Sequence, residues 1–126
     1  EVKAWTPYRR NGGPSSTAVP DLTTWPTVVA SAPDFKDTGH TEWPDGRVHH
    51  AGFTTVFGPN TKSPCLNGAT VLPECDFNSW QEGRNGTAGV PTYAAITSRS
   101  FHTGIVHAAM MDGAVRVVTE NIDRAI

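Results

Sequence analysis

The sequence has little charge, no long apolar segment and almost no clustering of basic residues. Only 17% of its 126 residues are charged, and 10 Lys and Arg against 12 Asp and Glu give a net charge of −2. Arg9 and Arg10 are the only adjacent basic residues, whereas nucleic-acid-binding proteins usually carry a basic face. No apolar stretch approaches the roughly 18 residues that span a bilayer. We therefore expect no nucleic-acid partner and no membrane-spanning segment within this chain.

Turn-forming and aromatic residues are what the sequence does contain. Its 12 glycines and 10 prolines predict many turns and few long helices. A chain of this length folds as one domain and buries roughly two-thirds of the surface that it exposes when unfolded. Tryptophans in such a chain can stack on sugars, but they more commonly cover a small core. The four tryptophans are Trp5, Trp25, Trp43 and Trp80.

Two cysteines, Cys65 and Cys75, lie on either side of a predicted turn. Asn67 and Gly68 form a turn pair between them, and Pro73 fixes one arm of the loop. The even count and the intervening turn favour a disulfide over two buried free thiols. The spacing matches no common zinc motif. A disulfide predicts a location outside the cytoplasm, in the periplasm, at the cell surface or secreted.

The first half of the chain has few signals for regular structure. Prolines and glycines interrupt residues 1–35, and Asp21 is expected to cap a short helix within residues 22–31. Pro26 limits that helix to a turn or two unless it occupies the first helical position. Residues 48–57 are rich in β-branched and aromatic residues, which predicts a strand.

The strongest local signal lies in the last third of the chain. After a second predicted strand at residues 90–98, two β-rich runs flank Asp112 and Gly113, a pair typical of a type I′ hairpin turn. Counting from this turn places Met111 opposite Ala114. Period two then puts five side chains on the face toward the core: Val106, Ala108, Met110, Val115 and Val117. The fold class predicted is α+β to mainly β, an antiparallel sheet with long loops that ends in this hairpin.

The hairpin also completes a longer motif, in which His102 is followed by nine residues and then Asp112 and Gly113. Further runs precede it in order: GHTEW at 39–43, DGRVH at 45–49, GFTT at 52–55, PNT at 59–61 and DFNS at 76–79. Together they resemble the His-x9-Asp-Gly C-terminal domain of a large family of pseudopilin-like proteins abundant in planctomycetes. The resemblance covers roughly residues 36–123.

The resemblance implies a subunit similar to type IV pilins or type II secretion pseudopilins, in which an N-terminal hydrophobic helix precedes a β-rich head. We expect residues 1–126 to be that head alone, a single domain. It would have an irregular segment with a short helix at 1–35 and a sheet with the disulfide loop at 48–119. The implied partners are copies of itself or other pilin-like subunits, and membrane contact would come only through the helix outside this chain.

His102, Asp112 and Gly113 admit two interpretations. The hairpin could bring the imidazole and the carboxylate together as a ligand or metal pair. Alternatively, Gly113 supplies a positive φ, Asp112 tolerates the left-handed region and bonds its own turn, and His102 bonds the backbone where the strand begins. A spacing that a hairpin fixes needs no chemistry to explain it, so the structural interpretation is favoured.

Calcium is the one cofactor that the sequence leaves open. Major pseudopilins of type II secretion systems bind calcium through loop oxygens, and Asp76, Asn78, Glu82 and Asn85 offer such oxygens within the long connection of residues 58–89. The run lacks the alternating acidic positions of an EF-hand. A hydrogen-bonded surface loop is the simpler interpretation.

Residues 40–50 contain the densest set of candidate metal ligands, namely His40, Glu42, Asp45, His49 and His50. On a strand, the adjacent residues His49 and His50 would point to opposite faces and could not easily bind one ion. Solvated loop residues are therefore expected here. A hydrolase that uses His40, Glu42, Asp45 and His49 is the third hypothesis.

These observations predict a non-enzymatic, extracytoplasmic structural subunit. It would be the head of a pseudopilin-like protein that takes part in a filament, a pseudopilus or an envelope assembly. The alternative is an extracellular binding module that holds a carbohydrate, a peptide or calcium through its long loops and exposed aromatic residues.

Overall fold

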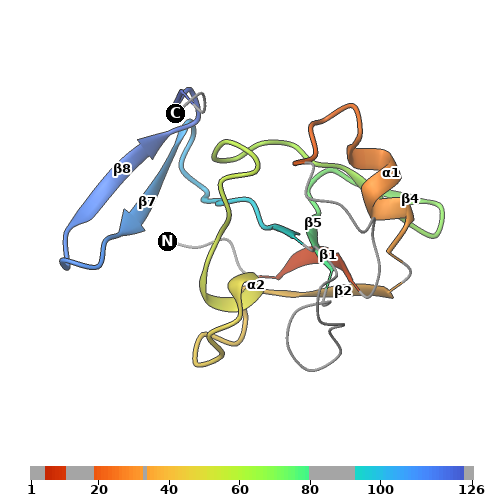
Figure 1. Cartoon of the computed structure of the whole chain (residues 1–126), viewed down its shortest axis with the longest axis horizontal. Coiled ribbons are helices and arrows are strands. Elements are labelled where there is room, and N and C mark those ends of the chain that lie inside the picture. Colours follow the sequence, from red (N-terminus) through yellow and green to blue (C-terminus); the bar gives the residue numbers. More distant parts are fainter. Residues whose placement is uncertain (1–4, 11–18, 33, 80–92, 124–126) are drawn as a thin grey trace.

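A computed structural model describes residues 5–10, 19–32, 34–79 and 93–123 of the chain. Short strands dominate the described part and two short helices accompany them, which confirms the α+β to mainly β class (Figure 1). The elements are β1 (Thr6–Arg10), α1 (Trp25–Ala30), β2 (Asp34–Gly39), α2 (Val48–Ala51), β3 (Cys65–Asn67), β4 (Thr70–Leu72), β5 (Asp76–Asn78), β6 (Ala94–Ala95), β7 (Ile105–Ala109) and β8 (Val115–Thr119).

The main sheet has the strand order β2-β1-β5-β6. Strand β1 pairs antiparallel with β2 and parallel with β5, so the sheet is mixed rather than antiparallel throughout. Residues 1–35, which the sequence predicts to be irregular, thus supply a central strand of the sheet. Tyr8 in this strand is buried and pairs with β2 on one side and β5 on the other. At the end of this pairing Thr6 lies opposite Gly39. A Cβ atom at Gly39 would lie 2.6 Å from the Thr6 carbonyl oxygen, so a glycine is required there.

The hydrophobic core lies where α1 packs beside the main sheet and the disulfide. Trp25 is fully buried, packs edge to face on Phe57 with ring centroids 5.2 Å apart, and donates a hydrogen bond from Nε1 to the Pro64 carbonyl at 3.0 Å. The predicted Cys65–Cys75 disulfide is confirmed, with both cysteines buried and a Cα–Cα distance of 5.8 Å. The buried cluster consists of Trp25, Val28, Val29, Ala32, Phe57, Cys65, Cys75, Phe77 and Ala95.

Helix α1 is shorter than the helix predicted within residues 22–31. The Asp21 carboxylate accepts backbone N–H bonds from Thr23 and Thr24, at 2.9 and 2.8 Å, and so caps the turn that precedes the helix. The side-chain hydrogen bond from Thr23, together with the bonds from Thr24, lowers the pKa of Asp21 to about 2. Pro26 lies in the first turn, where its missing N–H costs nothing.

The strand predicted over residues 48–57 is wrong. Val48–Ala51 form one helical turn, α2, whose first backbone hydrogen bonds run from His50 and Ala51 to the Arg47 carbonyl. The Asp45 carboxylate starts this turn by accepting the Arg47 N–H at 3.0 Å. A segment rich in β-branched and aromatic residues becomes a strand only where the edge of a sheet is free to pair with it. Here the segment begins with the helical turn α2, which buries the two consecutive side chains of His49 and His50. Of the second predicted strand, residues 94–95 form β6, residues 96–98 are not in a strand, and residues 90–92 lie outside the described part.

The predicted C-terminal hairpin is confirmed, but its register differs by one residue from the prediction. Gly113 N–H donates to the Met110 carbonyl and Met110 N–H donates to the Ala114 carbonyl, so the loop has three residues. The left-handed φ of +82° falls on Gly113 and not on Asp112, which makes this a type I turn with a bulge rather than a type I′ turn. A slip of one residue reverses the faces of a strand. Val115 and Val117 are consequently 67% and 56% exposed instead of facing the core.

A buried ion pair connects the main sheet to the chain that leads into this hairpin. Asp76 is 2% exposed, and its Oδ1 accepts hydrogen bonds from the Arg99 guanidinium and, at 3.1 Å, from the Thr97 N–H. Arg99 Nη2 donates to Ser63 Oγ at 2.7 Å, and that hydroxyl donates to the Cys75 carbonyl at 2.8 Å. Burial raises the pKa of Asp76, and the Arg99 charge opposes that effect.

Replacing both cysteines by serine is expected to lower the free energy of unfolding by roughly 2–3 kcal/mol, because the disulfide closes a short loop in the unfolded chain. Urea unfolding followed by tryptophan fluorescence measures this difference. The wild-type chain under reducing conditions serves as the control and should match the double variant. An unchanged unfolding midpoint in both samples would contradict the role given to the disulfide.

Arg99→Met leaves the Asp76 carboxylate buried without its counter-charge, and we expect it to lower the free energy of unfolding by about 3–5 kcal/mol. The double variant Asp76→Leu with Arg99→Met removes both charges and should be more stable than Arg99→Met alone. The matched control is Arg47→Met, which breaks an ion pair on the surface and should change stability little. Equal urea midpoints for Arg47→Met and Arg99→Met would refute this account.

Candidate functional site

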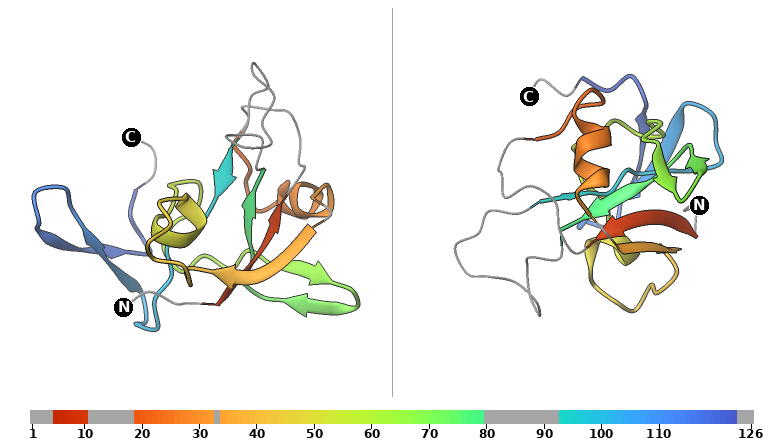
Figure 2. Two further views of the ribbon diagram at one scale, coloured as in Figure 1. Left: turned by 90° about the horizontal axis from the view of Figure 1, so that it is seen from below. Right: turned by 90° about the vertical axis from the view of Figure 1, so that its right-hand side faces the viewer.

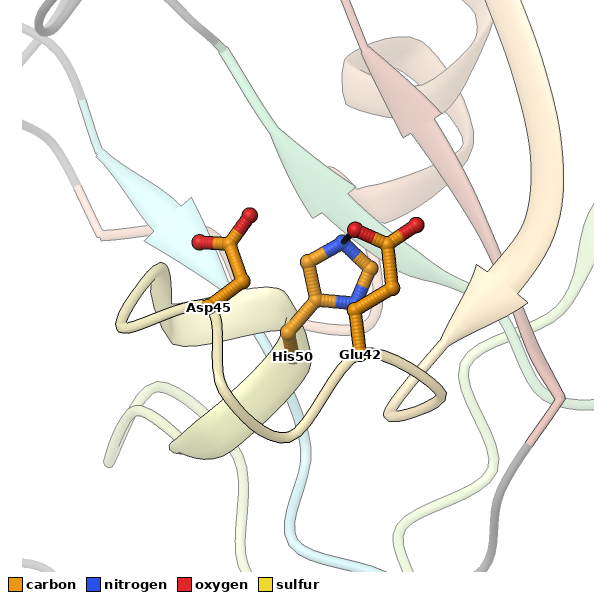
Figure 3. Close-up of side chains that lie close together, drawn as sticks. All are labelled: Glu42, Asp45 and His50. Atoms are coloured by element: carbon orange, nitrogen blue, oxygen red, sulfur yellow. Dashed lines mark ion pairs between the residues drawn. The ribbon is translucent and has the colours of Figure 1, made fainter.

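Among the described residues, the densest cluster of chemically active side chains is formed by Glu42, Asp45 and His50 (Figure 3). Glu42 and Asp45 belong to the turn between β2 and α2, and His50 belongs to α2. One potential ligand atom from each residue lies within 4.8 Å of the other two. The helical turn creates this cluster, because it brings His50 back over the turn that contains the two carboxylates.

Arg47 holds the two carboxylates of this cluster. Its Nε donates to both Asp45 oxygens, at 2.9 and 2.8 Å, and its Nη2 lies 4.0 Å from Glu42 Oε2. The hydrogen bonds from the Arg47 side chain, followed by the Arg47 N–H, hold the pKa of Asp45 well below its usual range. The Asp45 carboxylate is therefore ionised at neutral pH.

His50 contributes a buried imidazole to the same cluster. Its side chain is 3% exposed, and its Nε2 lies 3.7 Å from Glu42 Oε2. Its Nδ1 is buried without a hydrogen-bond partner among the described residues. A carboxylate and an imidazole at this separation attract each other when the imidazole is protonated, and both are also ligands for a metal ion.

The structure separates His40 and His49 from this cluster. His49 is buried, its ring lies 4.9 Å from that of Tyr8, and its Nδ1 forms a 2.9 Å hydrogen bond with the Asn78 amide. Burial lowers the pKa of His49 to about 4, so the ring is neutral at physiological pH. Of the four residues named in the hydrolase hypothesis, the cluster therefore contains Glu42 and Asp45 alone.

The expectation that adjacent histidines point to opposite faces is wrong, because it rested on the strand interpretation. In the helical turn both rings are buried, and their centroids are 4.2 Å apart. They are therefore not solvated loop residues. His40 is half-buried, has a left-handed φ of +58°, and burial lowers its pKa.

A cleft of about 650 Å³ lies between the α2 region and the hairpin. Its lining residues include His40, His50 and His107, together with Phe53 and Val106. Trp43 stands at this cleft with 83% of its surface exposed, and Trp5 is also exposed, in contrast to the buried Trp25. Trp80 lies outside the described residues.

The calcium candidates that the structure describes have protein partners. Asp76 is buried and its carboxylate is bonded by Arg99, and the amide nitrogen of Asn78 bonds His49 Nδ1. Glu82 and Asn85 lie outside the described residues. We accordingly do not propose calcium binding by this set.

His102 lies at the base of the hairpin and Asp112 at its tip, so the hairpin does not bring the two together. Asp112 Oδ1 accepts the Ala114 N–H at 2.9 Å and Gly113 supplies the positive φ, which agrees with the structural interpretation of these two residues. The φ of Asp112 is negative, so its expected left-handed conformation is wrong. The His102 ring packs edge to face on His107, with ring centroids 5.7 Å apart.

Sequence reasoning did not identify the role of Asn60. With a left-handed φ of +56°, this residue accepts the Ser100 N–H on Oδ1 at 3.0 Å and directs Nδ2 to the Ile105 carbonyl. It thus fixes the base of the hairpin. Asn60 belongs to the PNT run that contributes to the family resemblance, but only the fold shows which residues it bonds.

Comparisons with known proteins give the family and nothing beyond it. Within the described residues, no helix is long and apolar enough to cross a membrane. No curated protein and no solved structure matches the chain. A family model does match, over residues 1–125, and its description is SBP_bac_10, protein of unknown function (DUF1559). The chain therefore belongs to the SBP_bac_10 (DUF1559) family.

Proposed function

We propose that this chain is a non-enzymatic structural subunit outside the cytoplasm, the head of a pseudopilin-like protein that packs against other copies of itself in a filament or envelope assembly. The hairpin formed by β7 and β8 is the observation that carries the proposal. It extends away from the rest of the described chain at one end of the molecule (Figures 1 and 2).

The outward face of this hairpin is apolar and exposed. In the observed register His107 lies opposite Val117 and Ala109 opposite Val115, so these side chains share one face. The two valines are more than half exposed, and Met111 at the tip is fully exposed. An isolated two-stranded hairpin is marginally stable in water, and an exposed apolar face of this kind is typical of a contact surface.

Only one side of the hairpin is supported by the rest of the domain. Val106 is buried on that side, and Asn60 and Ser100 hold the base through the Ile105 carbonyl. The two strands pair with each other and with no further described strand, which leaves an unpaired edge on each. A partner that covers the hairpin would supply the missing contacts.

A second copy of the chain is the occupant that the surface fits best. The outward face has no formally charged side chain: its members are Ile105, His107, Ala109, Val115, Val117 and Thr119. Two identical faces can therefore meet without repulsion between like charges. The membership in SBP_bac_10, together with the resemblance to pseudopilin-like proteins, supports an assembly of similar subunits.

The disulfide supports the extracytoplasmic location. Cytoplasmic thiols are kept reduced, whereas disulfides form and persist in the periplasm and outside the cell. The Cys65–Cys75 bond is buried in the core and contacts both α1 and the main sheet. It is thus a structural disulfide, of the kind that is made during export.

A second candidate function is ligand binding in the cleft between α2 and the hairpin. The exposed indole of Trp43 beside a cleft of about 650 Å³ favours this alternative, because aromatic faces stack on sugars and peptides. Saturable quenching of tryptophan fluorescence by an oligosaccharide or peptide, abolished by Trp43→Ala, would support it over the structural proposal.

Cysteine trapping tests the assembly proposal. Val117→Cys should form a disulfide-linked dimer under mild oxidation, because two outward faces would bring the introduced cysteines together. The matched control is Val71→Cys, on the separate hairpin of β3 and β4, where the valine is 64% exposed. Non-reducing electrophoresis at increasing protein concentration measures the rate of each reaction. Equal rates for the two variants would refute contact through the outward face.

Val117→Lys provides the converse test. It should abolish the concentration-dependent self-association of the wild-type chain in sedimentation velocity, while the melting temperature stays nearly the same because the residue is exposed. Val71→Lys should leave self-association unchanged. A wild-type chain that remains monomeric at millimolar concentration would contradict the proposal.

A further inference from the structure

We propose that Glu42, Asp45 and His50 form a binding site for a divalent transition-metal ion, with zinc as the expected occupant. The site would join the turn between β2 and α2 to the helical turn itself (Figure 3). It does not depend on the assembly function proposed above, because it uses none of the residues on the outward face of the hairpin.

The donor set fits zinc. Imidazole nitrogens and carboxylate oxygens both bind zinc, and a zinc site with three protein ligands keeps a water in the fourth tetrahedral position. Calcium and magnesium prefer oxygen ligands alone, so an imidazole at the centre of the set disfavours them. His50 Nε2 and Glu42 Oε2 are 3.7 Å apart, close to the separation of about 3.4 Å that two ligands have around a tetrahedral zinc ion.

His50 is the observation that distinguishes this cluster from ordinary surface carboxylates. The residue is 6% exposed, its Nδ1 has no hydrogen-bond partner among the described residues, and its Nε2 lies 3.7 Å from Glu42 Oε2, beyond hydrogen-bond distance. A buried polar ring without partners is unfavourable. Nε2 faces Glu42 Oε2, and a metal ion bound between them would replace this long contact with two coordination bonds and fix the buried ring.

The exposed ligands can adjust to the ion. Glu42 is 58% exposed and Asp45 is 26% exposed at the side chain, whereas His50 is fixed by its burial in α2. The rigid ligand would thus set the position of the ion, and the two carboxylates would close on it. The small movement required is confined to the turn.

Arg47 would compete with the ion. Its guanidinium now neutralises both carboxylates, and 48% of its side chain is exposed, so it can turn toward solvent when a metal ion takes its place. Removing the positive charge should strengthen metal binding rather than weaken it.

Titration of the purified, disulfide-bonded chain with ZnCl₂ in a calorimeter tests the proposal. We expect one zinc ion per chain, at least tenfold weaker binding in Glu42→Gln and in His50→Gln, and several-fold tighter binding in Arg47→Gln. The matched control is His107→Gln, which removes an exposed histidine from β7 and should leave binding unchanged. Near-ultraviolet circular dichroism checks that each variant is folded.

Glu42→Gln keeps the test decisive if His50→Gln fails to fold, because Glu42 is on the surface. A visible absorption spectrum of four-coordinate Co²⁺, lost in Glu42→Gln, gives an independent readout. The proposal is refuted if zinc at millimolar concentration gives no saturable heat. It is also refuted if His107→Gln, rather than Glu42→Gln, abolishes binding, since the ion would then occupy the exposed His102–His107 pair.

Discussion

The buried ion pair between Asp76 and Arg99 is the interaction on which the arrangement of the other elements depends. Asp76 belongs to β5 in the main sheet, and Arg99 belongs to the segment that leads to the hairpin. Through Ser63 the pair also contacts the carbonyl of Cys75, and so the disulfide loop. Two buried charges must keep their geometry, because either alone would be strongly destabilising. Three segments that are distant in sequence are thereby held in one relative position.

This constraint explains how the hairpin can extend from the domain and still have a defined direction. Arg99 is followed directly by Ser100, whose hydroxyl donates to the Ile105 carbonyl, and the Asn60 amide donates to the same carbonyl. These hydrogen bonds fix the position where β7 begins, and Val106 in β7 is buried. The exposed valines therefore have a defined direction, as the proposed contact between copies of the chain would require.

The sequence predicts the features that depend on near neighbours. Asn67 and Gly68 between two cysteines indicated the disulfide, Asp21 indicated the first helix and Pro26 limited its length, and Asp112 and Gly113 indicated the hairpin. What could not be predicted depends on distant partners. Strand β1 is central because β2 and β5 lie on either side of it, and neither pairing has a local signal. The hairpin register depended on whether Asp112 as well as Gly113 takes the left-handed conformation, and composition alone does not decide that.

The sequence indicates Glu42, Asp45 and His50 among five candidate metal ligands, but it could not separate these three from His40 and His49, for the same reason that the strand predicted at residues 48–57 was wrong. Alternation along a strand would have sent His49 and His50 to opposite faces, whereas the turn started by Asp45 buries both. One ring then meets Asn78 in the sheet, and the other faces the carboxylate of Glu42. A single aspartate thus acts twice, since it begins the helical turn through the Arg47 N–H and presents its carboxylate to the histidine that the turn positions. A change at Asp45 would alter the local fold and the cluster together, so the metal test rests on Glu42 and Arg47, whose side chains are more exposed.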